Sequence, residues 1–170
     1  MTVSSSGPLS GVLVADLSRV LAGPYATMLL GDMGAQVIKV ERPGAGDDTR
    51  HWGPPFDPYG RATYFEGVNR NKQSLSIDMS TPEGLAQAQD LAARADVVVH
   101  NFPARIATKF ELDYESVRKT NPTVIHASVS GFGSGKGAAM PGYDLLVQAM
   151  GGLMSITGPA PGQPTKVGVA

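Results

Sequence analysis

The sequence contains no cysteine, and aromatic residues make up only 6% of its 170 residues. Without cysteine the chain can form no disulfide, no thiolate metal site and no cysteine nucleophile. Its formal net charge of −1 gives no electrostatic support to a nucleic acid or an anionic membrane as partner. No apolar run approaches the roughly 18 residues of a membrane span, and the polar start MTVSSSGPLSG does not resemble a signal peptide. These features predict a cytoplasmic protein that binds neither membranes nor nucleic acids.

The chain instead has the length of one domain and alternates between strand-like and helix-like segments. The expected strands are 11–18, 36–41, 73–79, 96–102 and 123–133, and a last strand begins at 164–170. The expected helices are 22–35, 80–95, a weaker stretch that restarts at Asp113, and 143–155. This alternation predicts an α/β fold, in which a mostly parallel sheet carries helices on both faces. The last strand has no helix after it, which suggests a truncated chain.

Ligands in such sheets bind at the carboxyl ends of the strands, here 16–18, 41–42, 100–102 and 130–133. His100 ends a strand, so it can either line a pocket or fill the core. His126 alternates with Val124 along a strand face, which favours a hydrogen-bonded structural histidine. The third histidine, at position 51, has no close partner for a metal site, and no metal is expected.

Common cofactor motifs are incomplete in this sequence. The turn LSRVLAGP has one glycine where a dinucleotide-binding turn needs three, so NAD is not expected. GFGSGKG lacks both ends of a phosphate-binding P-loop, and no G-x-S-x-G elbow is present. Several loop cations could hold a phosphorylated ligand or could simply be solvated, and both interpretations stay open. These cations are Arg42, Arg50, Arg70, Lys72, Arg105 and Lys109.

Several long segments, in order, resemble the N-terminal part of CoA-transferase family III. This family contains formyl-CoA transferase, carnitine CoA-transferase and α-methylacyl-CoA racemase. The matching segments include PLSGVLVADLSRVLAGP, GDMGAQVIKVERPGAGDDTR, NRNKQSLSIDMSTPEG, ADVVVHNF, NPTVIHASVSGFG and PGYDLLVQAMGGLMSITG. The resemblance covers nearly the whole chain. It implies that residues 1–170 are the N-terminal part of a Rossmann-like domain that binds CoA or acyl-CoA as substrate.

The resemblance also implies a CoA site across the strand ends. Arg42 matches an arginine that meets the nucleotide end of CoA, and residues 77–79 pack near the adenine opposite Asn101. Lys109 stands where the family has an arginine, and a lysine holds phosphate without the guanidinium fork. The implied binding residues are Val20, Leu21, Ala22, Arg42, Ile77, Asp78, Met79, Asn101, Phe102, Arg105, Lys109, Gly142 and Tyr143.

Tyr143 and Asp144 match a pair that borders the reacting thioester in the transferases. Racemases of the family have histidine before this aspartate, and tyrosine, with a pKa near 10, is the poorer base at neutral pH. Tyr143 therefore favours CoA transfer over racemisation. Asp144 can border the pocket, cap a helix N-terminus, or do both. Met140 stands where many relatives have a basic residue.

The family's nucleophile is an aspartate expected a few residues past Ala170. In the family it attacks an acyl-CoA thioester, which forms a mixed anhydride and expels the CoA thiolate. The thiolate then attacks the enzyme carbonyl, which gives an aspartyl-CoA thioester and releases the first acid as carboxylate. An incoming carboxylic acid takes up CoA through the reverse steps. We therefore expect this chain to be an inactive fragment of a CoA-transferase. The alternatives are an acyl-CoA racemase or isomerase and a non-catalytic CoA-binding module. Family members form interlocked homodimers, whereas this chain is expected to form a non-interlocked oligomer.

Overall fold

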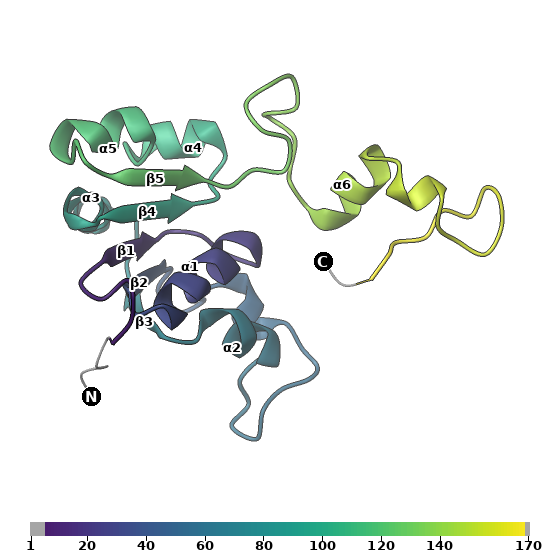
Figure 1. The fold of residues 1–170 in the computed structure, drawn as a ribbon, viewed down its shortest axis with the longest axis horizontal. Coiled ribbons are helices and arrows are strands. Elements are labelled where there is room, and N and C mark those ends of the chain that lie inside the picture. Colours follow the sequence, from purple (N-terminus) through teal and green to yellow (C-terminus); the bar gives the residue numbers. More distant parts are fainter. Residues whose placement is uncertain (1–5, 169–170) are drawn as a thin grey trace. The chain divides into compact units, whose positions relative to one another are not determined.

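The protein contains two compact units, which divide between Val129 and Ser130. The computed structural model describes residues 6–168. The first unit contains β1 (Leu13–Asp16), α1 (Ala22–Asp32), β2 (Gln36–Glu41), η1 (Asp48–His51), α2 (Thr63–Asn69), β3 (Lys72–Ser76), α3 (Pro82–Arg94), β4 (Val97–His100), α4 (Ala104–Lys109), α5 (Tyr114–Thr120) and β5 (Ile125–Ser128) (Figure 1). The second unit contains α6 (Asp144–Met150) and η2 (Leu153–Ser155).

The five strands form one parallel sheet in the order β3-β2-β1-β4-β5. Val14 of β1 lies in register with Val37 of β2 and Val97 of β4. After β3 the chain crosses the sheet to β4, so the order reverses between β1 and β4. In open α/β sheets this reversal marks the crevice where ligands bind. The predicted parallel α/β sheet is confirmed.

Helices cover both faces of the sheet. The larger apolar cluster joins Ala15 and Val98 to α3 and α5, and a smaller one packs Val14 and Val37 against α1. In α3 the buried residues Ala88, Leu91 and Ala92 follow helical spacing and form its core-facing stripe. Each fully buried valine or leucine contributes about 1.5–3 kcal/mol. Figure 1 shows α4 and α5 beside β5.

Three helix ends form as the sequence predicts. Thr81 caps α3 by accepting a hydrogen bond from the Gly84 N–H at 3.1 Å, and Pro82 occupies the first helical position. Asp113 caps α5 in the same way. Gly34 follows α1 with a φ of +99°, the left-handed conformation that ends many helices. These caps fix where each helix starts or stops relative to the sheet.

Four segments differ from expectation. Helix α2 was not predicted, and the helix expected over 143–155 breaks at Gly152, whose φ is +83°. The expected strand 73–79 is an exposed edge strand, with Leu75 41% exposed, rather than a half-buried one. The strand expected at 164–170 is absent over 164–168, and residues 169–170 lie outside the described range. There the Val167 N–H donates to the Gln148 side chain instead of to a neighbouring strand.

Between residues 6 and 168, the structure contains no helix that is both long enough and apolar enough to cross a membrane. The longest helix of the described residues, α3, has 13 residues, among them the charged Glu83, Asp90 and Arg94.

Candidate functional site

Three polar residues end neighbouring strands of the sheet. Asp16 is the last residue of β1, Glu41 of β2 and His100 of β4, and all three are buried. Because the strands are parallel, these residues and the loops that follow them share one edge of the sheet. We call this region, formed by residues 16–22, 41–48 and 100–102, the strand-end edge. It includes the reversal between β1 and β4 and is the candidate site.

Asp16 is fully buried and joins three elements. Its carboxylate accepts hydrogen bonds from Ser18, from the Thr27 hydroxyl at 2.7 Å and from the Lys72 ammonium at 2.9 Å. Lys72 also donates to the Pro24 carbonyl of α1 at 2.7 Å. Burial lowers the pKa of Lys72 to about 8, and Asp16 offsets part of that effect. The Asp16–Lys72 pair therefore ties β1, α1 and β3 together behind the strand-end edge.

A second buried ion pair supports the loop after β1. The Lys39 ammonium lies 2.9 Å from Asp47 Oδ2 and donates to the Ser18 carbonyl at 2.8 Å. Asp47 in turn accepts from the Val20 N–H at 3.2 Å. Burial would raise the pKa of Asp47, but the charge and hydrogen bonds of Lys39 and Thr49 outweigh it and lower the pKa. This carboxylate is therefore ionised where it holds the loop.

Val20 has a φ of +73°, which is rare for a β-branched residue. Such a conformation costs about 1–3 kcal/mol and persists only where the surroundings hold it. Here the bond from its N–H to Asp47 is one of the contacts that hold it. The loop at the strand-end edge is thus fixed in a strained conformation.

Glu41 binds Arg50 through two hydrogen bonds of 2.7 Å and also accepts from the Ser74 hydroxyl at 2.7 Å. Burial alone would raise its pKa, but the hydrogen bonds from Arg50, Ser74 and the Asp47 N–H lower it to about 2. Arg50 and Lys72 are therefore occupied by protein carboxylates, as is Arg70, which pairs with Asp32. Lys72 is buried in its pair and is not a solvated charge, whereas the Arg50 and Arg70 side chains keep exposed surface beside their partners. A phosphate-binding role for these cations stays a prediction.

His100 fills the core. Its side chain is buried, its Nδ1 accepts from the Phe102 N–H at 3.2 Å, and the two rings stack with centroids 5.3 Å apart. Burial, with a smaller contribution from His126, lowers the pKa of His100 to about 4. His126 lies 3.0 Å from the Leu112 carbonyl oxygen, which confirms it as a hydrogen-bonded structural histidine. Of the two roles left open for His100, the structure supports the core.

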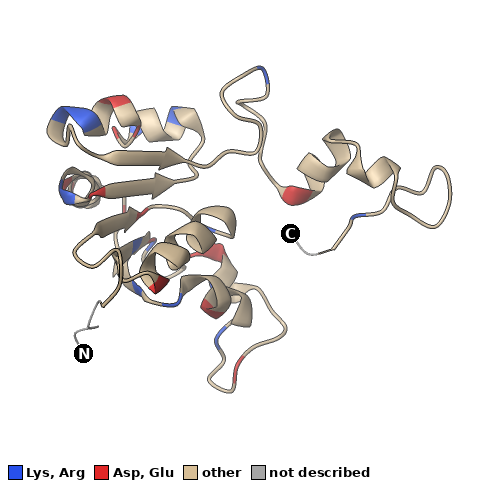
Figure 2. Cartoon of the chain, viewed as in Figure 1, with Lys and Arg blue, Asp and Glu red and all other residues tan. Residues whose placement is uncertain are grey.

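Asn101 and Arg42 lie on opposite sides of β1. The Asn101 amide accepts from the Arg19 N–H at 3.1 Å and donates to the Arg19 carbonyl at 2.8 Å. Arg42 is exposed and lies 2.8 Å from Asp48. Figure 2 shows Lys and Arg interspersed with Asp and Glu along the ribbon.

The other residues expected near the adenine and phosphates lie around the ends of β3 and β4. Ile77 is 2% exposed and belongs to the core, and its N–H donates to the Glu41 carbonyl, so its side chain and N–H are closed to a ligand in this structure. Asp78 accepts hydrogen bonds from Ser80 and starts the turn into α3, and Met79 packs against the core. Arg105 and Lys109 are exposed and four residues apart on α4, and therefore share one face of that helix.

The second unit holds Gly142, Tyr143 and Asp144. Tyr143 is 65% exposed and is the residue that precedes α6. Asp144 is the first helical residue, and it accepts from the Gln148 side chain at 2.9 Å. The expectation that Asp144 caps the helix is wrong. The cap position belongs to Tyr143, and the Asp144 carboxylate accepts a hydrogen bond from Gln148 within α6.

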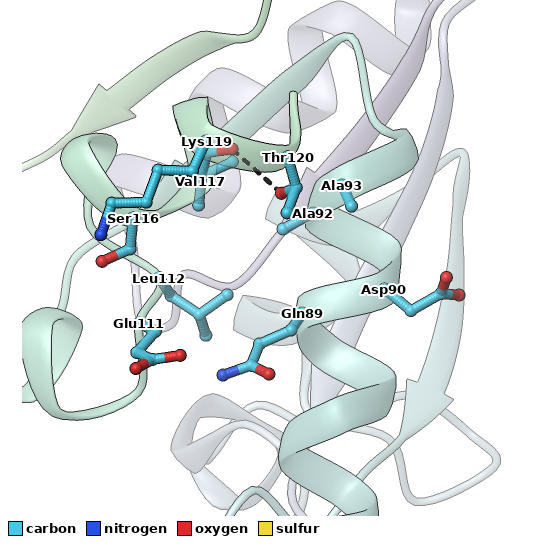
Figure 3. A pocket seen from close by; sticks show the side chains of 10 residues that line it. All are labelled: Gln89, Asp90, Ala92, Ala93, Glu111, Leu112, Ser116, Val117, Lys119 and Thr120. Carbon is cyan, nitrogen blue, oxygen red and sulfur yellow. Dashed lines mark hydrogen bonds between the residues drawn. The ribbon is translucent and has the colours of Figure 1, made fainter. Parts of the chain in front are cut away.

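A separate hollow of about 370 Å³ lies between α3 and α5 (Figure 3). In it, the Thr120 hydroxyl donates to the Val117 carbonyl at 3.1 Å. None of the strand-end residues lines this hollow. It is lined by Gln89, Asp90, Ala92, Ala93, Glu111, Leu112, Ser116, Val117, Lys119 and Thr120.

The sequence profile of CoA-transferase family III matches residues 9–170, nearly the whole chain. The chain belongs to this family. Among curated family III relatives, it is 52% identical to the succinate–glutarate CoA-transferase of Agrobacterium fabrum over 96% of this chain and 42% of that protein. It is 51% identical to the succinyl-CoA:glutarate CoA-transferase of Mus musculus over 98% of this chain and 38% of that protein. The chain thus spans about two fifths of the length of these relatives.

Solved structures agree with the family III assignment. A CAIB/BAIF family protein from Brucella suis superposes with a TM-score of 0.87 and 48% identity, over 96% of this chain and 44% of that one. A hypothetical protein from Mycobacterium tuberculosis superposes with a TM-score of 0.82 and 38% identity, over 95% of this chain and 44% of that one. The predicted resemblance and fold class are both confirmed.

In this family III chain the strand-end edge brings together Val20, Leu21, Ala22, Arg42, Asn101 and Phe102 from loops far apart in sequence. It stays a prediction that these residues bind CoA together with Gly142, Tyr143 and Asp144 of the second unit. Sequence reasoning missed Lys39 and Asp47, which support this edge, and it placed Asp16 at a strand end without its ion pair to Lys72. The signals available were a lysine within an otherwise buried strand, QVIKVE, and the acidic pair in GAGDDTR.

Proposed function

We propose that this chain is the CoA-binding part of an enzyme that transfers CoA between an acyl-CoA and a carboxylic acid. The observation that carries the proposal is the family III match over residues 9–170, within which expected binding residues from three separate loops gather at one sheet edge. We assign residues 1–170 to the N-terminal part of the Rossmann-like domain of that enzyme.

In this proposal CoA lies across the strand-end edge. Arg42 offers a guanidinium with charge-assisted hydrogen bonds for a phosphate. Phe102 and the segment Ile77–Met79 flank the adenine, and Arg105 and Lys109 add positive charge from α4. Val20 to Ala22 lie beside the acyl-transfer centre, at the thioester end of CoA. The rigidity of this loop supports the proposal, because an ordered site loses less entropy when it binds.

The transfer step needs a carboxylate nucleophile that attacks the thioester carbonyl and expels the CoA thiolate. The family resemblance implies that this nucleophile is an aspartate past Ala170, and Asp144 is engaged with Gln148. We therefore propose that residues 1–170 supply CoA binding and that CoA transfer needs that aspartate in addition. Tyr143 and Asp144 are assigned to the neighbourhood of the thioester.

The acid substrate is proposed to be a small dicarboxylic acid. This rests on the names of curated relatives, which include a succinate–glutarate CoA-transferase and, in Haloarcula hispanica, a succinyl-CoA:mesaconate CoA-transferase. The chain itself is assigned to the cytoplasm, in keeping with an enzyme of acyl-CoA metabolism.

Two measurements on the purified chain test the proposal. Calorimetric titration with CoA is expected to show binding. Incubation with succinyl-CoA and labelled glutarate is expected to show no transfer, and transfer would refute the claim that the chain lacks the nucleophile. Exchange of the α-proton of a branched acyl-CoA in D₂O would instead identify a racemase. Absence of CoA binding would overturn the proposal.

We further propose that the chain associates into a non-interlocked oligomer. β5 lies at the end of the strand order, and its Ile125 is 65% exposed. Exposed sheet edges and apolar side chains favour association. Light scattering of the purified chain is expected to give a mass above 17.7 kDa, and a clean monomer would contradict this.

A further inference from the structure

Arg19 shares a single carboxylate with Arg42. Arg19 Nη1 lies 3.1 Å from Asp48 Oδ2, and Arg42 Nη2 lies 2.8 Å from Asp48 Oδ1. The two guanidinium groups thus sit on the two oxygens of one carboxylate. Arg19 follows β1 and Arg42 follows β2, so this cluster lies at the strand-end edge.

This arrangement differs from the other ion pairs in the described part of the chain. Arg61 with Asp57 and Arg94 with Asp90 are local pairs four residues apart. Among the described ion pairs, Asp48 is the one carboxylate that contacts two arginines. Two cations around one anion leave a net positive charge, which favours an anionic ligand.

The backbone of Arg19 is fixed independently of its side chain. The Asn101 amide binds both the N–H and the carbonyl of Arg19. The next residue, Val20, is held in its left-handed conformation by Asp47. These contacts fix the backbone of Arg19 and so the position of its Cα. A fixed backbone reduces the conformational entropy that Arg19 loses when it binds a ligand. A freely solvated surface arginine would not need these contacts.

We propose that Arg19 is a second phosphate-binding cation, which acts with Arg42 on a phosphate group of CoA while Asp48 holds both side chains in place. A guanidinium has five N–H donors, and the structure gives each of these two arginines one side-chain hydrogen bond. The remaining donors suit phosphate oxygens, which arginine binds in a forked geometry. The inference rests on the proposed function, because it concerns the same ligand.

Calorimetric titration of the chain with CoA tests the proposal through Arg19→Gln. We expect this variant to bind CoA roughly tenfold more weakly, as the loss of a charge-assisted hydrogen bond to phosphate implies. Arg19→Lys, which keeps the charge without the fork, is expected to recover part of that loss. Arg61→Gln is the matched control, because the Arg61 side chain is 57% exposed against 52% for Arg19 and also pairs with an aspartate. The CoA affinity of this variant is expected to equal that of the unaltered chain.

Three ligands locate the contact. If Arg19→Gln weakens the binding of CoA but not that of dephospho-CoA, Arg19 binds the 3′-phosphate. If it weakens the binding of both ligands, Arg19 binds the diphosphate. Either result supports the proposal. The same loss with phosphate-free pantetheine would overturn it. Unchanged CoA affinity in Arg19→Gln would also overturn it while leaving the proposed function intact, whereas absence of CoA binding by the unaltered chain refutes the proposed function itself.

Discussion

The side-chain amide of Asn101 forms hydrogen bonds with both the N–H and the carbonyl of Arg19. Asn101 Oδ1 accepts from the Arg19 N–H at 3.1 Å, and Asn101 Nδ2 donates to the Arg19 carbonyl at 2.8 Å. The two residues are 82 positions apart and lie after β1 and β4, the strands that flank the reversal of strand order. This amide therefore bridges the ends of the two strands between which ligands of such sheets bind. Asn101 positions the loop, in addition to its expected place beside the adenine.

Asn101→Asp is expected to weaken CoA binding about tenfold. The carboxylate keeps an acceptor for the Arg19 N–H but loses the donor to the Arg19 carbonyl and places a negative charge beside it. An unmade hydrogen bond of this kind costs about 1–3 kcal/mol. Calorimetry with CoA measures the change in affinity, and urea unfolding measures the change in stability.

Asn121→Asp provides the matched control. The Asn121 amide donates to the carbonyls of Ala92 at 3.2 Å and Ala95 at 2.7 Å, away from the strand-end edge. This variant is expected to lose a similar amount of stability without losing CoA affinity. Equal losses of affinity in both aspartate variants would show that Asn101 acts through general stability and not by positioning the loop.

Lys72→Met is expected to destabilise the first unit by about 3–5 kcal/mol, because it leaves Asp16 buried and without its cation. Adding Asp16→Asn to this variant is expected to recover part of the loss, since the unpaired charge is then removed. Urea unfolding followed by circular dichroism gives the free energies. Arg61→Gln, which breaks an exposed pair, is expected to cost less than about 1 kcal/mol. A loss of that small size in Lys72→Met would contradict a buried ion pair.

The pKa of His100, lowered from 6.5 to about 4, predicts that stability falls in mild acid. Between these values the unfolded chain binds a proton that the folded chain does not, so the free energy of unfolding decreases as the pH falls. The decrease starts near pH 6.5, ends near pH 4 and amounts to at most about 3 kcal/mol. Urea unfolding at pH 7, 6 and 5 measures it.

His100→Asn keeps an acceptor for the Phe102 N–H and does not titrate in this range. The variant is expected to lose most of the pH dependence between pH 6.5 and 5, while His51→Asn, at an exposed residue, is expected to retain it. A pH dependence that persists in His100→Asn would assign the effect to other groups.

The sheet and its helices could be predicted because their signals are local. The buried run VVVH of β4 and the Thr81–Pro82 start of α3 each carry a pattern that neighbouring residues complete. Helix α2 has seven residues and no capping side chain, so the local sequence did not predict it. The segment at 164–168 has the composition of a strand, but a strand also needs a neighbour with which to pair.

The candidate site was predictable only in part. Arg42 and Asn101 were identified through resemblance to the family, whereas the support behind them depends on contacts distant in sequence. The two interpretations left open for Arg50 and Lys72, a phosphate ligand and a solvated charge, did not include a structural ion pair, because a sequence does not show that Glu41 and Asp16 will face them. The role of Arg19 likewise depends on Asp48, which lies 29 residues away.

The central claim is that CoA binds at the strand-end edge, and mapping amide chemical shifts of the chain during CoA titration tests it most directly. The account predicts that the shifted amides cluster at residues 18–22, 42–48 and 100–102. Shifts confined to the hollow at residues 89–93 and 111–120, or no shifts at all, would contradict it.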